Sequence, residues 1–420
     1  MTSKRANWLF LTIILVHFGV IAFLIFGGSL LPDSLVLSFF LSQSILVVPT
    51  IIFLLIFERR ETAPASRMQM PGALPVYGMS QPQIPGVPPA HGMPRTRMPG
   101  APTQFEAAAF HKVKISTLLM IMLCTFLIMP LVTVLNALTM FFTDNAVAAL
   151  EGDIVSTSFL VMLFMIGIFG PFCEEFVFRG VIYRSYRRSG CIENNMRYEN
   201  ARSNGISAMI LSSLLFGLMH MNFNQAVYAF AIGIFLVLLV EAAGSLWASV
   251  FCHMFFNSCQ VVLMYVSESL LNSVYGQAAN EAAEQLSAQD LLAALSIYLV
   301  IAAVTTPIAV CVIVWIAKNE GRQAAFSELF RRRDRRPVPE NRQPLPYRMP
   351  QQPMQLNLQP QPPISPYQMP QQQNWQQQWS QPQPPIPMEP PRAEYLLSVP
   401  LIIAIVLCLG YMSLELILLA

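Results

Sequence analysis

Apolar residues in this chain gather in long runs, separated by segments rich in charged, polar or proline residues. Each run is close to the length of about 20 residues that an α-helix needs to cross the hydrocarbon core of a bilayer. We therefore predict an all-α fold, a polytopic transmembrane helical bundle of about nine spans. The predicted spans are 8–26, 35–57, 114–141, 154–175, 206–222, 225–243, 246–266, 291–317 and 396–419.

The composition also indicates a membrane protein. Of the 420 residues, 54% are hydrophobic and 11% are charged, whereas soluble domains have about 25% charged residues. The net charge of +2 is small and does not predict a nucleic-acid partner. The partners that we expect are the lipid bilayer and a membrane-associated peptide or protein.

Two long segments between the spans lack a periodic apolar pattern. The segment 58–113 is rich in Pro, Gly and Met, and 337–391 is rich in Pro and Gln. We predict that both are disordered cytoplasmic linkers, acting as tethers or as docking sites for a partner that recognises extended Pro-rich sequence. The predicted organisation is 1–57 (two N-terminal transmembrane helices), 58–113 (first linker), 114–317 (transmembrane core), 318–394 (basic, then Pro/Gln-rich linker) and 395–420 (C-terminal transmembrane helix).

The positions of Lys and Arg predict the orientation of the spans, because short cytoplasmic loops are enriched in these residues. If the N-terminus, with Lys4 and Arg5, is cytoplasmic, the predicted outer loops contain neither Lys nor Arg. These outer loops are 27–34, 142–153, 223–224 and 267–290. We expect an integral protein of a bacterial-type plasma membrane, with both linkers in the cytoplasm and the C-terminus outside.

Three charged residues lie close together at the end of a long apolar run. Glu175 and Arg179 are spaced i,i+4, so on a helix they share a face and can neutralise each other. Glu174 points about 100° away from Glu175 and is left for another role. On a soluble helix this would be an ordinary surface ion pair, but charges inside a span are costly and mark functional sites.

Two further clusters place polar side chains in other spans. His220 lies near the end of the fifth predicted span, where a histidine could also be a satisfied core residue. His253 and Asn257 are spaced i,i+4 on the seventh span, where polar side chains can also join helices. At a rise of about 1.5 Å per residue, Glu174, His220 and His253 are each roughly 10–21 Å from the cytoplasmic end of their span. All three are therefore predicted inside the hydrocarbon core, where they can face one cavity.

Together these clusters resemble the signature of the CAAX prenyl endopeptidase and bacteriocin-processing family, also called the abortive-infection family. That signature is Glu-Glu-x-x-x-Arg, then Phe-x-x-x-His, then His-x-x-x-Asn or His-x-x-x-Asp. The resemblance covers about 154–266 and implies an intramembrane endopeptidase acting on a membrane-associated or lipidated substrate. The matching residues, in order and with the same spacing, are Glu174, Glu175, Arg179, Phe216, His220, His253 and Asn257.

The resemblance implies a role for each of these residues. Glu174 would be the general base that activates a water, assisted by His220. His253 and Asn257 would stabilise the tetrahedral oxyanion. Arg179 would hold Glu175, and the Gly170-Pro171 pair would start a new helical segment just upstream.

Three alternatives remain at this stage. No cofactor is expected, but Glu174, His220 and His253 could instead hold a catalytic zinc ion. A transporter could use the same polar cluster as a relay, although the chain shows none of the inverted repeats that would support it. A non-catalytic immunity or scaffold protein could act through the Pro-rich linkers.

Overall fold

A computed structural model of the chain describes residues 2–27, 34–61, 110–188, 192–193, 196–197, 205–270, 288–330 and 396–419. The two predicted linkers lie almost entirely outside the described residues, so their predicted disorder stays a prediction. The described residues belong to one compact unit, formed by Met1–Arg331 and Glu394–Ala420.

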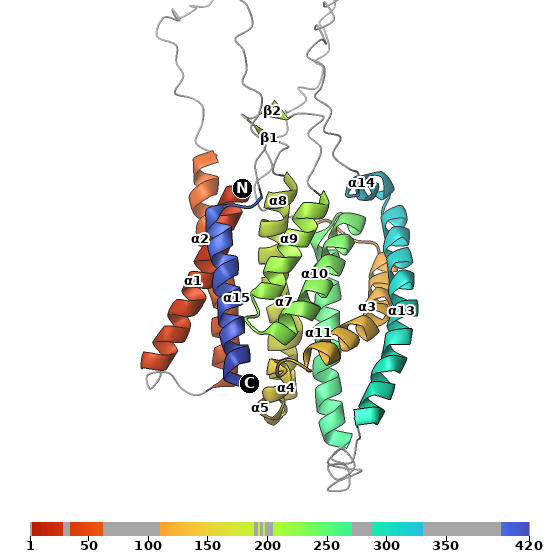
Figure 1. The fold of residues 1–420 in the computed structure, drawn as a ribbon. Helices are drawn as coiled ribbons and strands as arrows, with labels where there is room; N and C mark the ends of the chain where they lie inside the picture. Colours follow the sequence, from red (N-terminus) through yellow and green to blue (C-terminus); the bar gives the residue numbers. More distant parts are fainter. Residues whose placement is uncertain are drawn as a thin grey trace, which may run out of the picture. The chain divides into compact units, whose positions relative to one another are not determined.

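The described residues are helical, apart from two short strands, as the apolar runs predict (Figure 1). The strands β1 (Ile192–Glu193) and β2 (Met196–Arg197) pair antiparallel, with Ile192 opposite Arg197. The helices are α1 (Ser3–Gly27), α2 (Leu35–Glu61), α3 (Ile115–Thr139), α4 (Ala146–Ala149), α5 (Glu151–Ser156), α6 (Phe159–Met162), η3 (Leu163–Phe169), α7 (Gly170–Glu175), η4 (Phe176–Tyr183), α8 (Arg184–Arg188), α9 (Gly205–Leu218), α10 (Phe223–Ala243), α11 (Leu246–Leu270), α13 (Ala288–Asn319), α14 (Gln323–Glu328) and α15 (Val399–Leu419).

Eight helical stretches among the described residues are long and apolar enough to cross a membrane. Their outward faces expose large apolar side chains, such as Leu160 at 71% and Val300 at 65%. Water would penalise such a surface, whereas lipid would not. The chain is therefore an integral membrane protein with a helical transmembrane fold, as predicted.

The predicted span 206–222 differs from the others, because its helix is short. Helix α9 has only 14 residues and ends at Leu218. Met221 then adopts a left-handed backbone conformation with φ 54°, and the Asn222 side chain accepts a hydrogen bond from the Gln225 amide to start α10. Gly217 permits the close packing of α9 on α10, because a Cβ there would lie 2.5 Å from the carbonyl oxygen of Ala226. His220 consequently lies in a tight turn between two helices, and not within a span.

The predicted span 154–175 is shifted along the chain. Residues 154–156 belong to the short helix α5, and one continuous helical path runs from Phe159 to Arg187. Glu174 therefore lies near the middle of its span, not at the end of it. Gly170 begins α7 and Pro171 occupies its first turn, so a new helical segment starts at the predicted place without interrupting the path.

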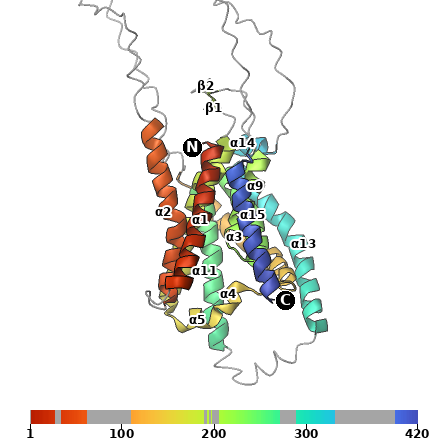
Figure 2. The same cartoon turned by 60° about the vertical axis from the view of Figure 1, so that its left-hand side comes forward.

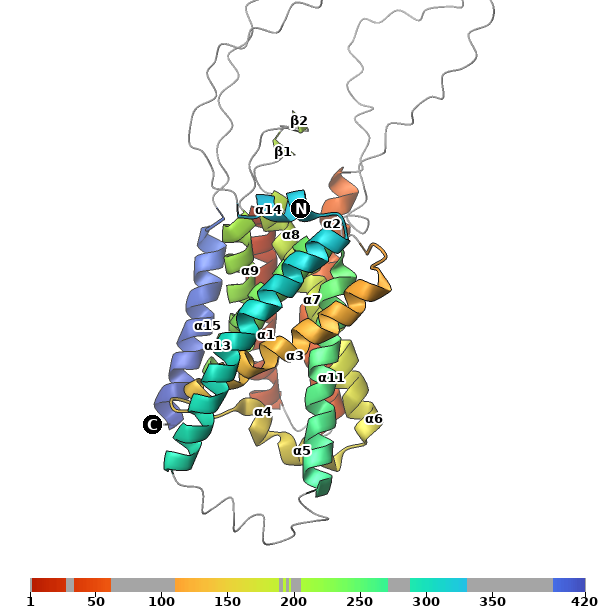
Figure 3. The same ribbon diagram turned by 90° about the vertical axis from the view of Figure 1, so that its right-hand side faces the viewer.

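Two groups of helices pack around the path from α6 to α8. On one side α11 packs against η3 and α7, while α3 packs against α10, α11 and α13. Helices α3 and α13 cross each other in Figure 3. On the other side α1 lies between α2 and α15 (Figure 2), and α2 contacts α7. The path that carries Glu174 is thus packed between the N-terminal helices α1 and α2 and the later helices α9, α10 and α11.

Candidate active site

The helix that carries the carboxylates changes its hydrogen-bonding pattern twice. The α-helical turn α7 lies between two π-helical segments, η3 and η4. In a π-helix each carbonyl accepts from the amide five residues later, and such segments occur often at functional sites. The amide of Gly170 follows this rule and donates to the carbonyl of Met165.

Pro171 leaves the next carbonyl of this ladder without its donor. The carbonyl of Ile166 would accept from residue 171, but proline has no N–H group. Asn257 fills this place from α11, because its Nδ2 donates to the Ile166 carbonyl oxygen at 3.3 Å. The neighbouring Ser258 hydroxyl donates to the carbonyl of Gly167 at 3.4 Å. Polar side chains of α11 therefore support the π-helical segment just before the Glu-Glu pair.

The expected ion pair between Glu175 and Arg179 is present and fully buried. Arg179 Nη1 donates to Glu175 Oε1 at 2.6 Å, with side-chain exposures of 1% and 0%. A buried ion pair needs further hydrogen bonds to offset the loss of hydration. Glu175 Oε2 and Arg179 Nη2 are buried and have no hydrogen-bond partner among the described residues.

His253 lies between the two adjacent carboxylates. Its Nδ1 is 3.0 Å from Glu175 Oε1, and its Nε2 is 3.8 Å from Glu174 Oε2. Because Glu175 is ionised against Arg179, its oxygen can only accept, and His253 Nδ1 must carry the proton of that hydrogen bond. His253 Nε2 is then an acceptor in the neutral ring and a donor in the imidazolium.

Glu174 occupies a different environment from Glu175. Its side chain is 14% exposed, and it makes no hydrogen bond to a described residue. The separation of 3.8 Å from His253 Nε2 is too long for a direct hydrogen bond but lets one water contact both groups. Glu174 is therefore the carboxylate that a water can reach.

Phe216 is the residue that connects the three clusters, although the sequence patterns assigned it no role beyond the motif. Its ring packs edge-on against His220 and His253, with ring centroids 5.2 and 5.8 Å apart. The Arg179 guanidinium lies over the same ring, 4.1 Å from its centroid. A cation over an aromatic face is attracted by the ring, so Phe216 helps to fix Arg179.

His220 is brought near the cluster through Phe216, not by direct bonding. Its Nδ1 lies 2.9 Å from the Phe216 carbonyl oxygen, which orients the ring and leaves Nε2 for other contacts. In the described part of the chain no hydrogen bond joins His220 to Glu174 or to His253. The assistance from His220 that the resemblance implies therefore stays a prediction.

The imidazole and carboxylate groups of this cluster are of the kinds that bind zinc. No group of three or more His, Cys, Asp or Glu side chains among the described residues is arranged to hold one. Glu174, His220 and His253, the ligands of the zinc alternative, therefore do not converge on a common point. His253 instead uses Nδ1 for Glu175, which leaves it a single nitrogen for any other partner.

Sequence patterns missed other polar groups inside the spans. Glu241 in α10 accepts a hydrogen bond from the Tyr183 hydroxyl at 2.6 Å. Gln43 in α2 is buried beside Gly170, and its Oε1 has no partner among the described residues. Neither belongs to a motif with a recognisable spacing, so only tertiary packing reveals its surroundings.

Comparison with known proteins agrees with the motifs. Residues 156–259 match the family model described as type II CAAX prenyl endopeptidase Rce1-like. No protein of curated function and no solved structure matches the chain. The matched segment contains Glu174, Glu175, Arg179, Phe216, His220, His253 and Asn257. The family resemblance read from the sequence is therefore confirmed for residues 156–259, which are similar to the Rce1-like type II CAAX prenyl endopeptidases.

Proposed function

We propose that this protein is an intramembrane endopeptidase that hydrolyses a peptide bond of a membrane-associated or lipidated substrate. The observation that carries the proposal is the pair of carboxylates around one buried imidazole, with Glu175 bound to Arg179 and Glu174 open to a water. The likeness of residues 156–259 to CAAX prenyl endopeptidases supports a prenylated peptide ending in a CAAX motif as the first substrate to test.

In the proposed reaction Glu174 is the general base. A water bound between Glu174 Oε2 and His253 Nε2 gives a proton to the carboxylate, and its oxygen forms a bond to the carbonyl carbon of the substrate. The carbonyl electron pair moves onto oxygen and gives a tetrahedral oxyanion. Glu174 then passes the proton to the leaving nitrogen, the C–N bond breaks, and the products are a carboxylic acid and an amine.

Two side chains of α11, His253 and Asn257, would stabilise the oxyanion. In the imidazolium form His253 Nε2 carries a hydrogen and can donate it to the oxyanion. Asn257 uses one amide hydrogen for the Ile166 carbonyl, which leaves the second for the substrate. The Glu175–Arg179 pair would hold His253 by its other nitrogen, so that the donor keeps its direction.

Replacement of the base tests this assignment. Glu174→Gln keeps the size of the side chain but cannot accept the proton, so cleavage of a quenched fluorescent farnesylated CAAX peptide should fall about 10²–10⁴-fold. Thermal unfolding of the variant should be unchanged, since Glu174 makes no hydrogen bond to a described residue. The exposed Glu328→Gln in α14 is the matched control, expected to cleave normally. Normal cleavage by Glu174→Gln would remove Glu174 from the mechanism.

The zinc alternative is tested on the same preparation. Under the proposed mechanism the purified protein keeps its activity after exhaustive chelation, and elemental analysis finds no stoichiometric metal. Loss of activity that is restored by zinc or cobalt would move the chemistry to a metal-bound water.

A further inference from the structure

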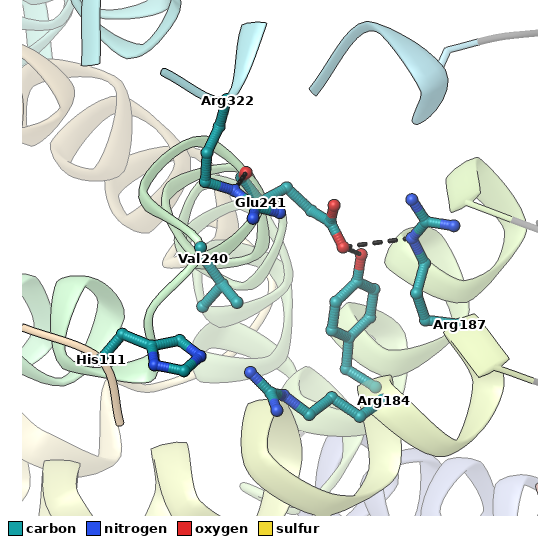
Figure 4. Close-up of a pocket in the computed structure, with 8 residues that line it drawn as sticks. His111, Arg184, Arg187, Val240, Glu241 and Arg322 are labelled. Atoms are coloured by element: carbon teal, nitrogen blue, oxygen red, sulfur yellow. Dashed lines mark hydrogen bonds and ion pairs between the residues drawn. The ribbon is translucent and has the colours of Figure 1, made fainter. Parts of the chain in front are cut away.

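A second polar site lies at one end of the helices, away from the Glu-Glu pair. It is a cavity of about 250 Å³ (Figure 4). Four transmembrane stretches begin or end around it, at Ile115, Arg187, Ala243 and Asn319. The cavity is therefore level with the boundary between hydrocarbon and water. Its polar lining side chains are His111, Tyr183, Arg184, Arg187, Glu241 and Arg322.

The cavity has more positive than negative charge. Three arginines, Arg184, Arg187 and Arg322, approach it from different sides in Figure 4, and the lining contains one carboxylate, Glu241. Glu241 Oε1 accepts from Arg187 Nε at 3.1 Å and from the Tyr183 hydroxyl at 2.6 Å. Among the residues that line the cavity, guanidinium groups therefore outnumber carboxylates.

The arginines are held in place by groups of the protein itself. Arg322 Nε donates to the backbone carbonyl of Glu241 at 3.2 Å, near the end of α10. Gly244 makes room for this side chain, since it has a left-handed φ of 71° and a Cβ there would lie 2.5 Å from Arg322 Cδ. Arg187 and Arg322 use only Nε in their bonds to described residues. Their terminal NH₂ groups therefore remain to bind a ligand.

We propose that this cavity binds the phosphate group of an anionic ligand. Guanidinium groups form paired, charge-assisted hydrogen bonds with phosphate oxygens, and fixed guanidinium groups lose little freedom on binding. The position of the cavity at the ends of four spans is the depth at which phospholipid headgroups lie, and basic pockets between spans bind anionic headgroups. Inorganic phosphate offers the same chemistry from the aqueous side.

The test uses the full chain in micelles of dodecyl maltoside, a detergent without a phosphate group. One series adds phosphatidylglycerol to the micelles, and a second adds inorganic phosphate to the buffer, with thermal unfolding as the readout of binding. We expect the unfolding temperature to rise in at least one series. A rise with phosphatidylglycerol alone indicates a headgroup site, a rise with inorganic phosphate alone indicates a soluble ligand, and a rise with both indicates recognition of the phosphate itself.

Charge-removing variants locate the binding. Arg187→Gln and Arg322→Gln should each weaken the apparent affinity about 10- to 100-fold, the loss expected for hydrogen bonds to a charged group. Lys318→Gln is the matched control, because Lys318 is exposed in the last turn of α13 and does not line the cavity. Ligand-free unfolding temperatures show whether each variant is folded, and either arginine variant alone is a sufficient test. No rise in either series, or an equal loss of affinity in Lys318→Gln, would overturn the proposal.

Discussion

Individual residues of the Glu-Glu-x-x-x-Arg motif have unequal roles. Glu175 binds Arg179 and His253, and all three side chains are buried. Glu174 is partly exposed, and its contact with His253 Nε2 is longer, at 3.8 Å. The two adjacent carboxylates therefore differ in role. Glu175 fixes the positions of Arg179 and His253, and Glu174 is the carboxylate that a water can reach.

The first prediction concerns the energetic coupling of Glu175 and Arg179. Glu175→Gln leaves Arg179 as an uncompensated buried charge, which should lower the free energy of unfolding by about 3–5 kcal/mol. Arg179→Gln should have a similar effect, since it leaves Glu175 unpaired. The double variant should lose less than the sum of the single losses, as measured by denaturant unfolding in mixed micelles. A second double-mutant cycle combines Arg179→Gln with Glu174→Gln. If this cycle shows the larger coupling energy, the helix is rotated from the observed orientation.

The spacing of residues along the chain predicted one of these contacts and not the other. The pair Glu175–Arg179 is local, and a four-residue separation places both side chains on one face of the helix. The contact between His253 and Glu175 joins residues in α11 and α7, and depends on how each helix is rotated about its axis. Spacing within each span does not say which of the two adjacent carboxylates, Glu174 or Glu175, meets the His253 ring. The sequence therefore predicted that these residues lie in one cluster, but it did not predict which of them bond to each other across helices.

Single helices and turns of this site depart from regular geometry. Pro171 was recognised from the sequence as the start of a helical segment, but the π-helical segments on both sides of α7 were not. The first of them, η3, has a donor from another helix, because Asn257 takes the place of the missing N–H group of Pro171. The predicted span 206–222 also ran past the end of α9 at Leu218, because Met219 and Met221 are apolar although they belong to the turn. Hydrophobicity alone does not show where a helix ends inside a membrane protein.

The second prediction separates two roles of Asn257. If its amide compensates for Pro171, Asn257→Ala should cost about 1–3 kcal/mol of unfolding free energy, the penalty of an unsatisfied buried carbonyl. The cost should shrink in a Pro171→Ala background, where residue 171 has an N–H group for the Ile166 carbonyl. If Asn257 also binds the oxyanion, kcat should fall about 10²–10³-fold in both backgrounds.

Ser258→Ala provides the control for this experiment. It removes the neighbouring bond to the Gly167 carbonyl but leaves Ile166 and its donor intact. Its stability loss should be the same in the original chain and in the Pro171→Ala background. An equal loss for Asn257→Ala in both backgrounds would show that Asn257 does not compensate for the proline.

At the scale of the whole molecule, helices outside the matched segment are bonded to the core by buried polar groups. Asn7 in α1 accepts a hydrogen bond from the Tyr186 hydroxyl at 2.6 Å and donates to the Ser398 hydroxyl at 2.8 Å. Glu415 in α15 accepts from Asn222 at 2.8 Å, two residues from His220. The first and last transmembrane helices therefore contact the elements that carry the site. No sequence pattern indicated this packing, since these contacts join residues far apart in the chain.

The last prediction concerns the orientation of the whole chain in the membrane, which rests on the distribution of Lys and Arg. Gly152 and Gln323 are exposed and lie in segments predicted to be outside and cytoplasmic, respectively. A Cβ at Gly152 would have no heavy atom within 4 Å, so a cysteine fits there without disturbing α5. On intact cells, a membrane-impermeant maleimide should label Gly152→Cys, and should label Gln323→Cys only after lysis. The unmodified chain is the control, because Cys311 is exposed on α13. Labelling of Gln323→Cys but not of Gly152→Cys on intact cells would invert the orientation, and it would put the arginine-lined cavity on the outer surface.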